Sequence, residues 1–74
     1  MTRNEALAPL EKGEARVNLT AGLAIRGAIR RGAINYGVNY YEEKGWLESV
    51  FVLRGEANRV IQLKKAIEQT FGDS

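Results

Sequence analysis

The sequence contains no cysteine and no histidine, and it has only one proline and one tryptophan. The lack of cysteine excludes disulfide bonds and thiolate chemistry, and the lack of histidine removes the most common acid–base group and metal ligand. We therefore expect no metal site, no cofactor and no enzymatic activity. A chain of 74 residues buries only about 60% of its unfolded surface, so without disulfides it depends on good packing or on a partner.

Charge and hydrophobicity point to neither a membrane nor a strongly charged ligand. Eleven Lys and Arg residues stand against nine Asp and Glu residues, which gives a net charge of +2. No segment approaches the roughly 20 apolar residues that cross a bilayer, and the N-terminal stretch MTRNEALAPLEKGE lacks the apolar core of a signal peptide. We therefore expect a soluble, cytoplasmic protein that binds no membrane and no small-molecule substrate.

Residues 1–13 are predicted to form an N-terminal arm or a short helix. Thr2 and Glu5 have the spacing of a capping box, in which both side chains bond to backbone N–H groups at a helix start. Pro9 then limits the helix to one or two turns. The arm either frays, binds a partner, or folds over a sheet face with its leucines.

Residues 14–72 are predicted to form a single α+β domain that begins with a strand and a helix. The stretch EARVNLT at 14–20 alternates apolar and polar residues, as a half-buried strand does. Residues 21–32 place alanines and isoleucines at helical spacing, with Gly32 as the expected helix end. A β-meander over residues 14–54, without this helix, is the alternative.

A β-hairpin is predicted next, from YGVNYY at 36–41 and WLESVFVL at 46–53 around the loop 42–45. This loop places Tyr41 opposite Trp46, and residues opposite each other share a face of the sheet. One set of side chains faces the helices, namely Tyr36, Val38, Tyr40, Leu47, Phe51 and Leu53. The set that faces away is Asn39, Tyr41, Trp46, Glu48, Val50 and Val52.

The last predicted element is a helix over residues 56–71, EANRVIQLKKAIEQTF, with apolar residues at helical spacing and Gly72 as its expected end. The order is then strand, helix, strand, strand, helix. We predict a small two-layer β-α-β-β-α sandwich, with a three-stranded antiparallel sheet and both helices on one face. This is the ferredoxin-like order without its last strand.

The stretch GVNYYEEKGWLESVFVLRGEANRVIQLKKAIEQ, residues 37–69, resembles the second half of acylphosphatase-like domains, where a hairpin leads through a glycine into an amphipathic helix. Acylphosphatases also need a glycine-rich phosphate loop that ends in a catalytic arginine after the first strand. The corresponding stretch here, VNLTAGLAIRG at 17–27, departs from that loop. The resemblance therefore implies the fold class and no activity.

Two short motifs bear on catalysis, and neither favours it. Gly22 and Gly27 have the G-x4-G spacing of a phosphate-binding loop, but Ala and Ile follow where that loop has Lys and Ser or Thr. Glu42 and Glu43 are adjacent carboxylates in the predicted turn, where charges are normally solvated.

The predicted sheet face without helices is the main candidate binding surface. Exposed apolar patches mark binding sites, and Tyr and Trp are typical anchors in them. We expect this face to bind a protein partner or a second copy of the chain, as in a non-catalytic adaptor or a phage-type inhibitor. Its candidate contact residues are Asn39, Tyr41, Trp46, Glu48, Val50 and Val52.

The alternative prediction, from another functional class, is single-stranded nucleic-acid binding. Tyr41 and Trp46 would stack on bases. The side chains that would contact phosphate are Arg16, Arg26, Arg30 and Arg31. A solvated basic surface also explains these arginines, and Glu48 would repel phosphate.

Overall fold

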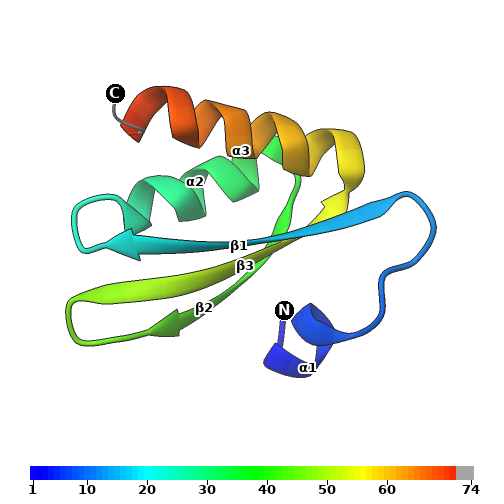
Figure 1. Ribbon diagram of the computed structural model, residues 1–74, viewed down its shortest axis with the longest axis horizontal. Coiled ribbons are helices and arrows are strands. Elements are labelled where there is room, and N and C mark those ends of the chain that lie inside the picture. Colours follow the sequence, from blue (N-terminus) through cyan, green and yellow to red (C-terminus); the bar gives the residue numbers. More distant parts are fainter. Residues whose placement is uncertain (72–74) are drawn as a thin grey trace.

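The three strands of the computed structural model form one antiparallel sheet in the order β1-β3-β2, so the last strand in the chain is central (Figure 1). The structure describes residues 1–71, and Gly72 therefore lies outside the described residues. The elements are α1 (Arg3–Leu7), β1 (Glu14–Gly22), α2 (Arg26–Tyr36), β2 (Asn39–Lys44), β3 (Glu48–Glu56) and α3 (Ala57–Phe71). The predicted α+β class and β-α-β-β-α order are confirmed.

The hydrophobic core joins β3 to α2 and α3. Its fully buried members include Phe51 and Leu53 from β3, Ile29 from α2 and Leu63 from α3. Burial of a side chain of this size contributes about 1.5–3 kcal/mol, so these few residues supply much of the stability of a small domain. In Figure 1, α2 and α3 lie above the sheet and α1 lies below it.

The N-terminal arm begins with the predicted capping box. Thr2 Oγ1 accepts a hydrogen bond from the Glu5 N–H at 3.2 Å, and Glu5 Oε1 accepts one from the Thr2 N–H at 2.8 Å. Ala6 is fully buried, whereas Leu7 and Leu10 stay exposed. The face predicted to be open is therefore partly covered by the arm, although the contact is made by Ala6 and not by the leucines.

Helix α2 begins and ends later than predicted. The sequence predicts a helix over residues 21–32, but Ala21 and Gly22 belong to β1 and the helix begins only at Arg26. The sequence predicts an end at Gly32, but the helix continues to Tyr36 and stops at Gly37, which has a left-handed φ of 68°. The N–H groups of Gly37 and of the next residue bond to carbonyl oxygens of the last helical turn, as in a Schellman motif. Gly32 lies inside the helix and allows α3 to pack closely, because a Cβ atom there would lie 2.9 Å from Cδ1 of Leu63 on α3.

The hairpin register also differs from the prediction. The sequence predicts Tyr41 opposite Trp46 around the loop 42–45, but the structure pairs Tyr41 with Val52 and forms the turn from residues 45–47. The two glutamates expected in the turn belong to β2. The partner of Tyr41 moves by six residues, an even number, so most strand residues keep their predicted face. Trp46, however, leaves the sheet.

Candidate functional site

One end of the molecule gathers exposed apolar side chains. The β1–α2 connection and the β2–β3 turn both lie at the end of the sheet where Gly22 pairs with Glu48 (Figure 1). At this end Trp46 is 92% exposed, Leu47 69% and Leu23 54%. We refer to Leu23, Trp46 and Leu47 as the apolar end.

The turn holds Trp46 away from the body of the protein. The Gly45 N–H donates a hydrogen bond to the carbonyl oxygen of Glu48 at 2.8 Å. A Cβ atom at Gly45 would lie 2.5 Å from that same oxygen, so this tight turn requires glycine. Full burial of a large apolar side chain stabilises a protein by about 1.5–3 kcal/mol. Trp46 and its neighbour Leu47 are exposed to water, so they contribute little of this free energy. Exposed apolar groups of this kind mark binding surfaces.

A buried polar cluster ties the hairpin to α2 beneath the apolar end. Arg30 donates two hydrogen bonds to the Glu42 carboxylate, at 2.7 and 3.0 Å. The Ser49 hydroxyl, which has no exposed surface, donates to the same carboxylate at 2.7 Å. Arg26 in turn donates to Ser49 Oγ at 3.3 Å. Four side chains from three elements thus fix the position of the turn.

The cluster also sets the ionisation of Glu42. The pKa of this carboxyl is lowered from 4.5 to about 2, mainly by the hydrogen bonds from Arg30 and to a smaller extent by the hydrogen bond from the Ser49 hydroxyl. Burial acts in the opposite direction and raises the pKa, but it is outweighed. Glu42 is therefore an anion at neutral pH, held in place by its partners.

This cluster has residue types found in catalytic sites, but their arrangement is structural. The Ser49 hydroxyl donates a hydrogen bond to a carboxylate that is already paired with an arginine, and Ser49 has no solvent-exposed surface. Only 8% of the Glu42 side chain is exposed. Within residues 1–71 no group of three acidic side chains comes together as a metal site would require. The cluster is arranged to hold the hairpin on α2.

The residues predicted to bind a partner do not form one surface. Val52 is buried on the α1 side of the sheet, at 6% exposure, whereas Val50 remains 43% exposed on the same face. Tyr41 is half-buried beside Val52. Asn39 lies at one end of the face, opposite Arg54, and Glu48 and Trp46 lie at or beyond the other end. The structure thus separates the aromatic pair Tyr41 and Trp46 that the sequence analysis placed together.

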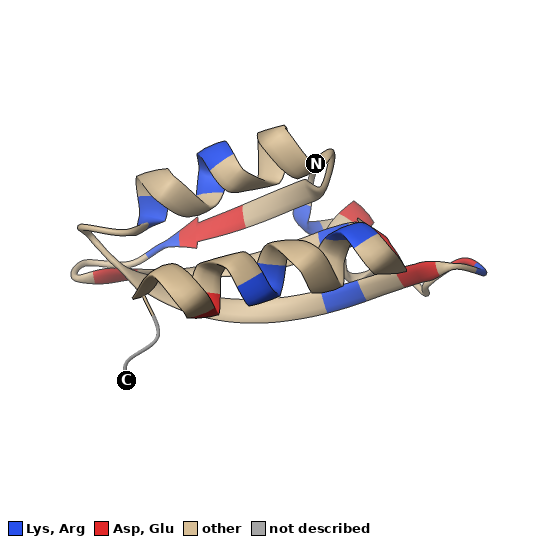
Figure 2. Ribbon diagram, turned by 90° about the horizontal axis from the view of Figure 1, so that it is seen from above, with Lys and Arg blue, Asp and Glu red and all other residues tan. Residues whose placement is uncertain are grey.

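Three of the four arginines predicted to contact phosphate make contacts within the protein. Arg26 and Arg30 belong to the polar cluster. Arg16 donates to two carbonyl oxygens of the N-terminal arm, at 3.0 and 2.6 Å. Arg31 makes no such bond to any residue in the described part of the chain. The charged residues of α2 are all basic, whereas β2 and α3 contain residues of both signs (Figure 2).

Arg54 is an important residue that the sequence analysis missed. Its guanidinium donates hydrogen bonds of 2.6–3.2 Å to the carbonyl oxygens of Glu5, Ala8 and Pro9 and twice to the carboxylate of Glu14. These bonds use all five N–H donors of the side chain, so Arg54 has none left for an anionic ligand. Arg54 follows Val50 and Val52 at every second position of β3, so the sequence indicates that it shares their face of the sheet. The sequence does not indicate that Arg54 binds the N-terminal arm.

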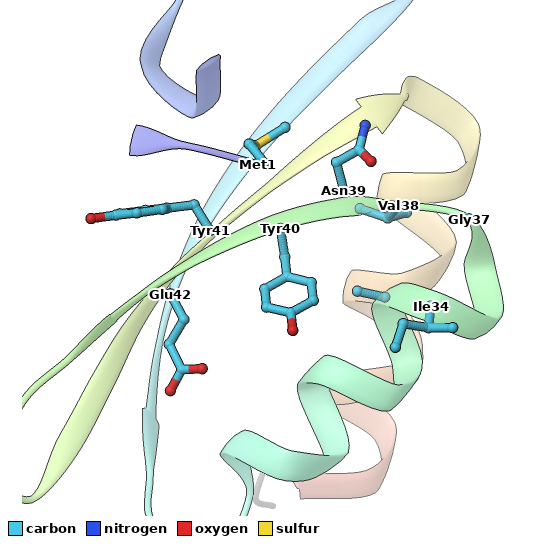
Figure 3. Close-up of a pocket in the computed structure, with 9 residues that line it drawn as sticks. Met1, Ile34, Gly37, Val38, Asn39, Tyr40, Tyr41 and Glu42 are labelled. Carbon is cyan, nitrogen blue, oxygen red and sulfur yellow. The ribbon is translucent and has the colours of Figure 1, made fainter. Parts of the chain in front are cut away.

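A hollow of about 710 Å³ follows the free edge of β2 (Figure 3). Tyr40 and Glu42 point to the α2 side of the strand, where Ile34 lies, and Asn39 and Tyr41 point away from it. The hollow therefore wraps around an edge and is not an enclosed pocket. Its only charged side chain is Glu42, which already pairs with an arginine, and its other polar lining includes Tyr40 and Tyr41.

No protein family model, curated protein or solved structure matches this chain. No helix within residues 1–71 is long and apolar enough to span a bilayer. The functional argument therefore depends on the geometry of the apolar end, the polar cluster beneath it and the sheet edges.

Proposed function

We propose that this protein is a small non-catalytic binding domain that contacts a protein partner through the apolar end. The observation that carries the proposal is the 92% exposure of Trp46 beside the exposed Leu47 and Leu23. Tryptophan is among the residues most enriched at interface positions that dominate binding energy. The function is of the class predicted from the sequence, an adaptor or an inhibitor, but the proposed surface is the end of the sheet and not its face.

The support beneath the apolar end favours this role. Gly45 fixes the turn, and the bonds between Arg30, Glu42 and Ser49 hold the hairpin against α2. An anchor that is held in place before binding loses less conformational entropy when the partner arrives. The same apolar side chains on a loose loop would bind more weakly for an equal contact area.

The test compares Trp46→Ala with Ile34→Ala. Ile34 is a suitable control because it is 71% exposed but lies on α2, by the β2 edge and away from the apolar end. Proteins captured by the wild type would be purified singly, and their affinities for all three chains measured by calorimetry. We expect Trp46→Ala to cost at least about 2 kcal/mol, or roughly thirtyfold in Kd, and Ile34→Ala to have little effect.

Equal affinity of every captured protein for both variants would remove the apolar end as the site.

The nucleic-acid alternative has one observation in its favour, which is that an exposed indole is free to stack on a base. Titration of Trp46 fluorescence with single-stranded DNA and RNA at low and high salt tests it directly. Saturable quenching that salt abolishes would identify nucleic acid as the ligand in place of a protein.

A further inference from the structure

The outer edge of β1 is unprotected. In the sheet order β1-β3-β2 this strand is at one edge, and it pairs with β3 over nine residues without a bulge, from Glu14 opposite Glu56 to Gly22 opposite Glu48. In the described part of the chain, no other strand pairs with its outer side. Natural proteins normally blunt such edges with short strands, proline, lysine or bulges, and β1 has none of these.

The other edge of the sheet is different. Strand β2 is six residues long and carries the exposed charges of Glu43 and Lys44 near its end. From Val17 to Gly22, β1 has no charged residue. The two edges of the sheet therefore differ in length and in the position of their charges: β2 is short and ends in exposed charges, whereas the charges of β1, Glu14 and Arg16, lie in its first three residues.

The side chains of β1 also suit a neighbouring strand. On the helix side, Ala15, Val17 and Leu19 pack against the core but are only partly buried. They remain partly exposed because no strand lies beyond them. On the opposite face, Asn18 and Thr20 are exposed. A strand added to this edge would cover the apolar row and meet a polar row whose two charged members, Glu14 and Arg16, lie near the start of the strand.

We propose that two copies of this chain pair through β1 in antiparallel orientation, which gives a continuous six-stranded sheet. The register that uses the full length of the strand, from Glu14 to Gly22, places Asn18 opposite Asn18 of the second copy. Residues directly opposite then share a face, as an antiparallel ladder requires. The remaining pairs are Ala15 with Ala21, Val17 with Leu19, Arg16 with Thr20, and Glu14 with Gly22.

Self-pairing is favoured over pairing with an unrelated strand because β1 is complementary to itself in this register. The helix-side pairs contain only apolar residues, so a hydrophobic row extends across the junction. No two like charges face each other, because Arg16 meets Thr20 and Glu14 meets Gly22. The inference does not depend on the apolar end, which is a different surface of the molecule.

The mass of the wild-type protein in solution is the first test. Analytical ultracentrifugation over a range of concentrations should show a species of twice the 8.2 kDa chain mass. Trp46→Ala should leave this mass unchanged, which separates the dimer from the proposed partner site. A single-chain mass at the highest soluble concentration would overturn the proposal.

Charge variants of Asn18 test the register. Asn18→Lys and Asn18→Asp each place two like charges opposite each other, and we expect each to raise the dimer dissociation constant several-fold. Mixing the two in equal amounts pairs opposite charges and should restore dimers. Asn18→Thr, which adds no charge, is the matched control and should remain dimeric.

Dimer dissociation constants that equal the wild-type value in both charge variants would exclude the β1 edge. Stronger dimerisation of Asn18→Asp alone would overturn the register, because it would place residue 18 opposite Arg16. Asn18 is exposed, so both variants should fold, as circular dichroism can verify. If either does not, Thr20→Lys tests the same pairing by facing Arg16 of the second copy.

Discussion

Glu42 and Arg54 bring opposite charges to opposite faces of the sheet, and each is held by several hydrogen bonds. Glu42 accepts from Arg30 and Ser49 on the helix side, and Arg54 donates five bonds on the α1 side. Transfer of a charged side chain from water to the protein interior costs several kcal/mol unless hydrogen bonds of this kind replace the lost hydration. The sequence analysis placed Glu42 in the turn, and its pairing with Arg30 explains why this residue is stable inside β2.

Acid should destabilise the protein through Glu42. The folded pKa of this carboxyl, about 2, lies below its unfolded value of 4.5, so its contribution to stability is complete above the unfolded value and is lost as the pH falls from about 5 towards 2. We expect this loss to be on the order of 1–3 kcal/mol. Water screens the pair in part, because the Arg30 side chain is 34% exposed.

Urea unfolding at a series of pH values measures this effect. Glu42→Gln should lower stability at neutral pH and flatten the decline in acid. Glu43→Gln is the matched control, since it removes a neighbouring carboxylate that is exposed. An equally steep acid decline in Glu42→Gln and the wild type would assign the effect to other groups.

The helices and strands were predictable where their signal is local. Alternation over residues 14–20 and helical spacing over 56–71 identified β1 and α3, because a period of two or 3.6 residues reflects the environment of each side chain directly. The end of α2 and the hairpin register depend on distant residues. Leu63 lies against Gly32, and Arg30 neutralises Glu42, and neither contact can be seen from spacing along the chain.

The glycines of α2 should respond differently to substitution by alanine. A Cβ atom at Gly27 would lie 3.6 Å from the nearest atom, an Arg31 nitrogen, which is an ordinary contact. Gly27→Ala should therefore raise the free energy of unfolding by up to about 1 kcal/mol through helix propensity. Gly32 lies in the interior of the helix, where the full propensity gain applies, but Gly32→Ala presses on Leu63, which is only 1% exposed and cannot move without disturbing the core.

We expect the difference in unfolding free energy between these two variants to be about 1 kcal/mol or more in favour of Gly27→Ala. Thermal or urea denaturation followed by circular dichroism measures it. Equal stabilisation by both substitutions would show that α2 and α3 are not packed as closely as the 2.9 Å approach indicates.

At the scale of the whole molecule, the hydrogen bonds of Arg54 hold the N-terminal arm against the sheet. Arg54→Met removes all five hydrogen bonds and leaves the carbonyl oxygens of Glu5 and Pro9 without this donor, whereas Ala8 keeps its bond from Arg16 and Glu14 keeps its bond from the Glu11 N–H. We expect a loss of stability on the order of 2–3 kcal/mol and release of the arm, seen as faster tryptic cleavage after Lys12.

Arg59→Met is the control for this substitution. Its ion pair with Glu56 is exposed and spans 3.8 Å, so its loss should cost less than about 1 kcal/mol and should not speed cleavage of the arm. Unchanged tryptic cleavage in Arg54→Met would show that the arm is held mainly by other contacts, such as those of Arg16.

The candidate site was predictable in part for the same reason as the fold. The sequence analysis named Trp46 among the candidate partner contacts, and the structure shows this side chain 92% exposed. Trp46 was placed on the sheet face because the hairpin signal does not fix where the turn lies. Coverage of Val52 on the α1 side depends on the N-terminal arm, which is distant from it in sequence and is bound by Arg54.

The unequal edges of the sheet bear on how far self-association can proceed. A pair of chains joined at β1 would leave β2 outermost on both sides, and β2 is short and ends in Glu43 and Lys44. A two-fold contact of this kind uses up the one edge that invites addition, so growth stops at the dimer and does not continue into fibres. The charged residues on β2 would then limit the assembly to two chains.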